Sequence, residues 1–561
     1  MILNFISFLF AILLFYQTSV YSKIDNNSEF NSKNLSNYFS ALILSNNKKN
    51  SKALEHFSLS RSLINNHDPY LKKYVNSLVI EGKISRAIKE LKFNLGKKNS
   101  NFFEAYLLLT LDSIRKKNFK ESKKYLDKIS NFKENGNFEL IIYESLKNYI
   151  YLFENKKIHM KNSSLGNLGS INRAFQSCYL GEEKANVYFL NLINKTDTNY
   201  SRYIFFYINY LIEKNRYEEV NEISKQIDVL NTNLLILQSE KWINQKSLKN
   251  FTNIFSCKNE NDILAEFIFL IANLYSSEND FNRSNFYNQI SIFLNPKFVF
   301  NLSLMAENHY MNQNYRECEK ILENFNKKNE AYYWYKIKKK AHIIAKKQGN
   351  KKSFSYLNSK FNKIKNPSIK ILLDMANISK SYKEYKISIE YYNNVLSKLV
   401  KNSTNYADVL YKRGSSYERL GEFSKSDKDL LESLKINIDD AYTLNYLAYS
   451  WLERNYKIDT AIEMLETAYK KKKNDPYIID SIGWAYYLVG DFIKAEQLMK
   501  RALELMPDDP IVNDHYGDIL WSLDKKMQAQ YYWQSVLNFD DTEESMKEEI
   551  NIKLLKGPKK I

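Results

Sequence analysis

Apolar and small residues recur at helical spacing along most of the chain, and the pattern is clearest in residues 476–507. There, Ile479, Gly483 and Tyr486 are spaced by four and three residues, which places them on one face of a helix. A second amphipathic segment follows and carries Ala495 on its apolar face, and a proline then ends the unit. The pattern predicts two helices joined by a short turn.

This two-helix unit repeats at steps of 34 or 35 residues, apart from two steps of 63 and 64 and one of 38. The small residue of the second helix falls on Ala53, Ala87, Ser122, Ala185, Val220, Ser284, Cys318, Ser353, Ser388, Ser426, Ala461, Ala495 and Ala529. Two antiparallel helices approach closely only where a small residue lies between them. Each double step leaves room for one degenerate unit, so the spacing predicts about fifteen helical pairs.

A single pair of helices cannot bury its own apolar face, so the pairs must stack into an elongated array. The composition agrees with this prediction. Glycine and proline together number 13 + 7 = 20 of 561 residues, which is too few for the many tight turns of a β-sandwich or β-barrel. The predicted fold class is therefore all-α.

The spacing resembles that of the tetratricopeptide-repeat family, whose 34-residue unit carries Trp-x2-Leu-Gly-x2-Tyr, then Ala-x3-Phe, then Pro. Here the first aromatic position is usually aliphatic, as at Leu410, Leu444 and Ile479. The resemblance covers roughly residues 38–537. It implies an α-solenoid, a right-handed superhelix of antiparallel helix pairs, that serves as a binding scaffold.

The resemblance also implies that four positions of each first helix line a concave inner surface. In the last three units these positions hold Tyr442, Asn445, Tyr449 and Leu452; Tyr477, Asp480, Trp484 and Tyr487; and Ile511, Asp514, Asp518 and Trp521. Aromatic rings beside side chains that bond backbone amides suit an extended peptide or a partner helix. The alternative is that several of these rings only pack against neighbouring helices.

One ligand class of the family is not expected here. Its chaperone-tail binders use lysines and arginines in this groove to hold a terminal carboxylate. Asn445, Asp480 and Asp514 stand where such a site would need a cation.

Catalytic chemistry has little support in the sequence. Asp514 and Asp518 share a helical face, but His515 points about 100° away from them. No phosphate-binding loop, dinucleotide fingerprint, nucleophile elbow or HExxH motif is present. We therefore expect no enzyme activity, no cofactor and no metal.

The first 22 residues are typical of a secretory signal. Residues 6–15 form an apolar run, and Val20 and Ser22 are small residues at the positions before a cleavage. An uncleaved anchor is the alternative, because no Lys or Arg precedes the apolar run. Three sparse cysteines form no disulfide framework; Cys318 is expected as a buried thiol, and a Cys178–Cys257 bridge is left open.

We expect seven segments along the chain. They are a signal peptide (1–22), a linker (23–37), an N-terminal repeat array (38–155), an irregular connection (156–172), a middle degenerate array (173–400), a C-terminal array (401–537) and a capping helix with a tail (538–561).

The net charge of +18 comes mostly from scattered lysines that form no dense stripe, so nucleic acid is not an expected partner. The stretches 480–487 and 513–521 resemble the closing repeats of long exported proteobacterial repeat proteins. One branch of that group is an adaptor that holds an envelope protease and presents cell-wall hydrolases to it. The resemblance implies protein partners in the periplasm or cell envelope, with membrane association through an uncleaved N-terminus as the alternative.

Overall fold

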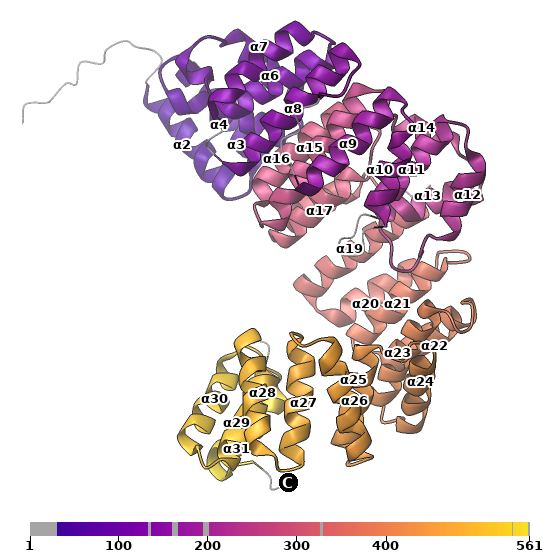
Figure 1. The fold of residues 1–561 in the computed structure, drawn as a ribbon. Coiled ribbons are helices and arrows are strands. Elements are labelled where there is room, and N and C mark those ends of the chain that lie inside the picture. Colours follow the sequence, from indigo (N-terminus) through magenta and orange to yellow (C-terminus); the bar gives the residue numbers. More distant parts are fainter. Residues whose placement is uncertain are drawn as a thin grey trace, which may run out of the picture. The chain divides into compact units, whose positions relative to one another are not determined.

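The chain folds into helices throughout the residues described by the computed structural model. These residues are 31–132, 136–159, 166–194, 201–325, 329–540 and 542–558, so the signal-like segment lies outside them. Within these ranges the structure contains thirty α-helices, α2 to α31, three short 3-10 helices and no strand (Figure 1). The predicted all-α fold class is confirmed. None of the described helices is long and apolar enough to cross a membrane.

The chain divides into two compact units, and the boundary between Ile343 and Ile344 falls within α19 (Glu330–Gln348). The α-helices of the first unit are α2 (Ser32–Asn46), α3 (Asn50–Leu59), α4 (Asp68–Ile80), α5 (Ile84–Phe93), α6 (Phe103–Arg115), α7 (Phe119–Ile129), α8 (Asn137–Asn155), α9 (Gly166–Leu180), α10 (Lys184–Ile193), α11 (Arg202–Glu213), α12 (Tyr217–Lys225), α13 (Leu234–Asn244), α14 (Lys249–Ile254), α15 (Glu260–Ser277), α16 (Phe281–Leu294), α17 (Asn301–Met311) and α18 (Tyr315–Leu322). Its 3-10 helices are η1 (Arg61–Asn65), η2 (Lys98–Ser100) and η3 (Ser130–Phe132).

From Ile369 onward, the second unit is a regular series of helix pairs in which each pair packs on the next. Its helices are α20 (Asn350–Phe361), α21 (Ile369–Ser381), α22 (Tyr385–Leu396), α23 (Thr404–Arg419), α24 (Phe423–Ile436), α25 (Ala441–Glu453), α26 (Ile458–Lys471), α27 (Pro476–Leu488), α28 (Phe492–Leu505), α29 (Pro510–Ser522), α30 (Lys526–Asn538) and α31 (Glu544–Lys556). α31 lies where the sequence predicts a capping helix.

The small residues that reveal the period are all buried, and apart from Ser353 of α20 each lies on a helix that packs against the other helix of its pair. Each of them is at most 1% exposed, and each except Ala185 is the fourth residue of its helix. A side chain at Gly483, on the facing helix α27, would meet Met499 Cε at 3.3 Å. The predicted packing of one helix of a pair on the other is therefore confirmed.

The two double steps in the period have different structures. In the first step, α8 is a long single helix, and the described residues between it and α9 contain no second helix. In the second, α13 is followed by α14, which has only six residues. Both breaks lie in the first unit, so its stacking is less regular than the sequence period alone predicts.

The first unit also folds back on itself, which the period does not predict. α4 packs against α16 and α6 against α15, although about 200 residues separate the first two helices and about 150 the second two (Figure 1). The Gln289 amide donates a hydrogen bond to the Ile80 carbonyl at 3.1 Å. The Arg115 guanidinium lies 4.6 Å from the centre of the Phe293 ring. These contacts bring the N-terminal repeats beside the middle ones.

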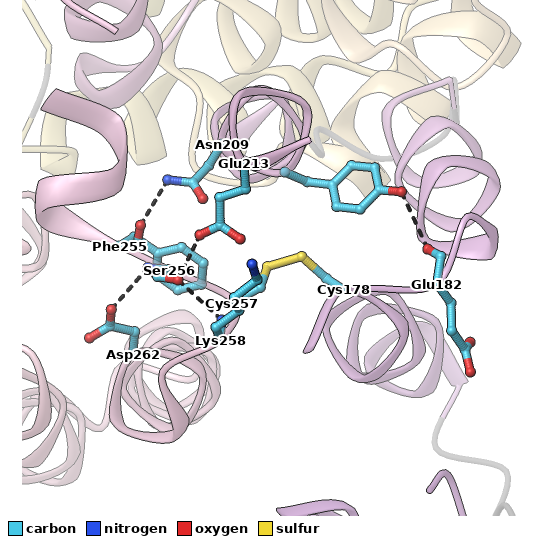
Figure 2. The surroundings of a disulfide bond; sticks show 10 residues. Cys178, Glu182, Asn209, Glu213, Phe255, Ser256, Cys257, Lys258 and Asp262 are labelled. Atoms are coloured by element: carbon cyan, nitrogen blue, oxygen red, sulfur yellow. Dashed lines mark hydrogen bonds between the residues drawn. A yellow bond between two sulfur atoms is a disulfide. The ribbon is translucent and has the colours of Figure 1, made fainter. Parts of the chain in front are cut away.

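A disulfide joins Cys178 of α9 to Cys257 in the turn before α15, with the two Cα atoms 5.7 Å apart (Figure 2). Hydrogen bonds hold the turn on both sides of the cysteine. Asn209 donates to the Phe255 carbonyl at 2.8 Å, and the Ser256 backbone N–H donates to Asp262 at 2.9 Å. Sequence spacing left this pairing open, and the structure forms it. Cys318 is a free, buried thiol, as predicted.

Candidate protein-binding surface

The candidate surface is built on the first helices of the last three pairs, α25, α27 and α29, which lie next to one another. Each begins at an aspartate whose carboxylate accepts hydrogen bonds from backbone N–H groups of the first turn, namely Asp440, Asp475 and Asp509. A proline follows in α27 and α29, where its missing N–H costs no hydrogen bond. These caps fix where each helix starts and so align the predicted positions from one repeat to the next.

The first predicted position of each helix is open to solvent. Tyr442 is 48% exposed, Tyr477 is 62% exposed and Ile511 is 52% exposed. The Tyr442 hydroxyl donates to Asp475 of the next repeat at 3.2 Å. These side chains form an exposed apolar row with one member per repeat.

Asn445 and Tyr449 of α25 are half-buried. Asn445 Oδ1 is a buried oxygen that has no hydrogen-bond partner within the residues that the structure describes. A buried acceptor without a partner is costly, so this oxygen suits a donor from a ligand. Among the predicted surface residues, Asn445 is the one whose buried side-chain oxygen lacks a hydrogen bond within the described residues.

The middle of α27 is occupied by a stack of rings. The Trp484 ring lies between Tyr487, 4.7 Å away, and His515, 4.0 Å away, and both pairs are nearly parallel. Trp484 Nε1 donates to Glu453 at 3.1 Å. Trp484 is thus half-buried and Tyr487 fully buried, so their contacts are largely with neighbouring helices.

His515 is buried and bonds Asp480 through Nδ1 at 2.8 Å. Burial acts to lower the pKa of His515, but the carboxylates of Asp480, Asp514 and Asp518, with Asp480 the largest contributor, together raise the pKa above its ordinary value. Asp480 therefore has a partner inside the protein, and this pair ties α27 to α29.

Asp514 and Asp518 are buried beneath the capping helix α31. Lys553 of α31 lies between them, with its Nζ 2.7 Å from Asp514 and 2.9 Å from Asp518. Trp533 Nε1 donates to Asp518 at 3.2 Å. Burial, with Asp514 adding to it, raises the pKa of Asp518 to about 6. The pairing of Lys553 with Asp514 and Asp518 was not predicted from the sequence. The signal that could have shown it is a lysine in the predicted capping helix, which lies C-terminal to a helix with two carboxylates on one face.

Trp521 is half-buried and is also covered by the C-terminal segment. Its ring lies 5.4 Å from that of Trp533, and Gly557 lies so close to it that a side chain there would collide with the indole. Of the twelve predicted residues, the open or half-open ones are therefore Tyr442, Asn445, Tyr449, Tyr477, Trp484, Ile511 and Trp521. Leu452, Asp480, Tyr487, Asp514 and Asp518 lie inside the packed structure.

Metal chemistry has no support in the described part of the chain, where no group of three His, Cys, Asp or Glu side chains could hold an ion. The candidate surface leaves open the exposed Tyr442 and Tyr477 rings and the Asn445 oxygen, which is unpartnered among the residues described.

Two curated relatives share short stretches with the chain. A TPR repeat-containing protein of Pseudomonas aeruginosa is 32% identical over 111 residues, which is 20% of this chain and 19% of that protein. Subunit 3 of the anaphase-promoting complex of Schizosaccharomyces pombe is 24% identical over 120 residues, 21% of this chain and 16% of that protein. The chain thus spans less than a fifth of the length of either relative. No protein-family model matches it.

Solved structures also resemble parts of the chain. A thermophilic TPR protein of Thermus thermophilus is 16% identical, with 34% of this chain and 100% of that chain covered and a TM-score of 0.30. MamA from Desulfovibrio magneticus is 16% identical, with 31% and 97% covered and a TM-score of 0.27. These TM-scores are too low for a comparison of overall shape.

Proposed function

Since the chain carries tetratricopeptide repeats, we propose that it is a non-catalytic scaffold of the bacterial cell envelope that binds partner proteins along α25 and α27. The occupant that we propose is an amphipathic helix or an extended peptide. An envelope protease and cell-wall hydrolases are the partners that the resemblance suggests.

The contact between α31 and α29 carries this proposal. In the last repeat, three of the positions that the resemblance assigns to the inner surface, Asp514, Asp518 and Trp521, are covered by the chain's own C-terminal segment, which includes α31. Ile550 of α31 is fully buried there, and Lys553 fills the space between two carboxylates.

In α25, the position equivalent to Asp514 holds Asn445, whose oxygen has no partner in the described residues. The exposed first position holds Tyr442 in α25 and Tyr477 in α27. A helix from another protein can bind α25 and α27 in the way that α31 binds α29.

Affinity capture with crosslinking from the native envelope tests the proposal. The bait is the full chain, beside a variant in which Tyr442 and Tyr477 are both changed to alanine. We expect a partner to crosslink to α25 or α27 of the unaltered chain and to be lost from the variant, because both rings are exposed and their removal leaves the core intact.

The matched control is Tyr531→Ala. Tyr531 is 67% exposed but lies on α30, a second helix. Equal crosslinking of the partner to all three chains would contradict the assignment of the surface to α25 and α27. A partner that crosslinks only to the first unit would do the same.

Two features support export as the setting. One is the signal-like first 22 residues, and the other is the Cys178–Cys257 disulfide, since disulfides persist in oxidising compartments. Sequencing the N-terminus of the mature protein distinguishes a cleaved signal peptide from an uncleaved membrane anchor. A start at Lys23 supports a cleaved signal, whereas an intact N-terminus supports a membrane-anchored assembly factor instead.

A further inference from the structure

A cavity of about 390 Å³ lies in the first unit where α4 and α6 meet α15 and α16. It is formed by segments about 150 to 200 residues apart and exists only because the N-terminal repeats fold back onto the middle ones. Its volume is within the range of sites for small ligands.

The floor of the cavity is aromatic. Its rings are buried and belong to Phe102, Phe103, Tyr275, Phe286 and Tyr287. Tyr275 and Tyr287 are stacked in parallel with their centres 5.2 Å apart. Such a floor favours a flat or branched apolar group.

The charged residues around the cavity fall into two kinds. Some are neutralised by protein partners: Lys72 pairs with Glu104 at 3.2 Å, and Arg283 with Asp280 at 3.5 Å. Lys73 and Glu139 also line the cavity, and neither has an ion-pair partner in the described part of the chain. The exposed Lys73 ammonium and the half-buried Glu139 carboxylate therefore border the same aromatic rings, and the Glu139 charge also acts on Arg283, which lines the cavity as well.

We propose that this cavity binds a small zwitterion with an apolar side chain, namely a free aromatic amino acid or a short peptide that ends in one. The ring lies on the aromatic floor, the ammonium group meets the Glu139 carboxylate, and the carboxylate meets the Lys73 ammonium. This inference goes beyond the proposed scaffold function, because it concerns the first unit and a small ligand.

Isothermal titration calorimetry of the full chain tests this inference. The probes are phenylalanine, the dipeptide Ala-Phe, N-acetylphenylalanine and phenylalaninamide. We expect at least one of the first two to bind, and tighter binding of one identifies the free amino acid or the peptide as the source. N-acetylphenylalanine lacks the ammonium group and phenylalaninamide lacks the carboxylate, so each should bind about tenfold or more weakly than phenylalanine.

Three variants complete the test. Lys73→Ala and Glu139→Gln should each weaken binding about tenfold, because each removes one charge-assisted contact. Lys89→Ala, an exposed lysine on α5 away from the cavity, is the control and should bind like the unaltered chain. Circular dichroism confirms that each variant is folded. The inference is overturned if neither zwitterion binds at 10 mM, or if folded Lys73→Ala and Glu139→Gln bind as tightly as the control.

Discussion

At the scale of single residues, the molecule places ionisable groups inside helix contacts and pairs them there. His515 and Asp480 join α27 to α29, and Lys553 joins α31 to two carboxylates of α29. Buried pairs of this kind specify which helix lies against which, because removing one partner leaves the other charge buried. The stack of Trp484 on His515 adds an aromatic contact to the same place.

The His515–Asp480 pair makes the stability of the second unit depend on pH. Because the pKa of His515 is raised in the folded protein, its stabilising contribution is fully present below pH 6.5 and is lost as the pH rises through the folded value. We expect the difference in unfolding free energy between the unaltered chain and His515→Asn to be larger at pH 6 than at pH 9. Urea unfolding at both pH values measures it, and a difference that grows with pH would contradict the pairing.

At the scale of helices, the small residue of each second helix fixes the distance between the two members of a pair. Ala495 is fully buried against α27, so Ala495→Leu should lower the free energy of unfolding by about 1–3 kcal/mol. Gln497→Leu, an exposed position on the same helix, should change it by less than about 0.5 kcal/mol. Thermal or urea unfolding compares the two variants, and equal losses would show that Ala495 is not at a close contact.

The capping helix depends on its one buried lysine. Lys553→Ala leaves the Asp514 and Asp518 carboxylates buried without a cation, and we expect it to cost about 3–5 kcal/mol near neutral pH. The loss should shrink below pH 6, where Asp518 becomes protonated. Lys556→Ala, at an exposed position of the same helix, is the control for urea unfolding. A loss no greater than that of the control would mean that α31 is held by its apolar side chains alone.

At the scale of the whole molecule, the two units differ in what holds them together. The disulfide and the helix contacts between distant repeats lie in the first unit. The second is stabilised mainly by contacts between successive pairs, with one exposed ion pair, Lys383 to Glu543 at 2.9 Å, between distant repeats. We expect calorimetry to show two unfolding transitions. A reductant should shift only the transition of the first unit, by a loss of about 2–5 kcal/mol, because both bonded cysteines lie there.

The double variant Cys178→Ala, Cys257→Ala is the control for this measurement. Its first transition should match that of the reduced chain and should not respond to the reductant. A single cooperative transition, or an equal shift of both, would contradict the division at Ile343.

The sequence by itself determined the all-α fold, the pairing of helices and the positions where they touch. Ala53 and Ala529 stand at opposite ends of the chain and occupy equivalent buried positions. This was predictable because each repeat makes most of its contacts with its neighbours in sequence, so the same residue types recur at the same spacing. The choice of Tyr442 and Tyr477 as binding residues stays a prediction, and so does the predicted division into arrays.

Only the tertiary structure decided which distant segments meet. Lys553 reaches Asp514 across 39 residues, Cys178 bonds Cys257 across 79, and Gln289 reaches Ile80 across 209. Each of these contacts is made once by a single side chain, so it leaves no period in the sequence. A repeating pattern encodes the contact of each pair with the next, whereas a contact that occurs once depends on which distant segments the folded unit brings together.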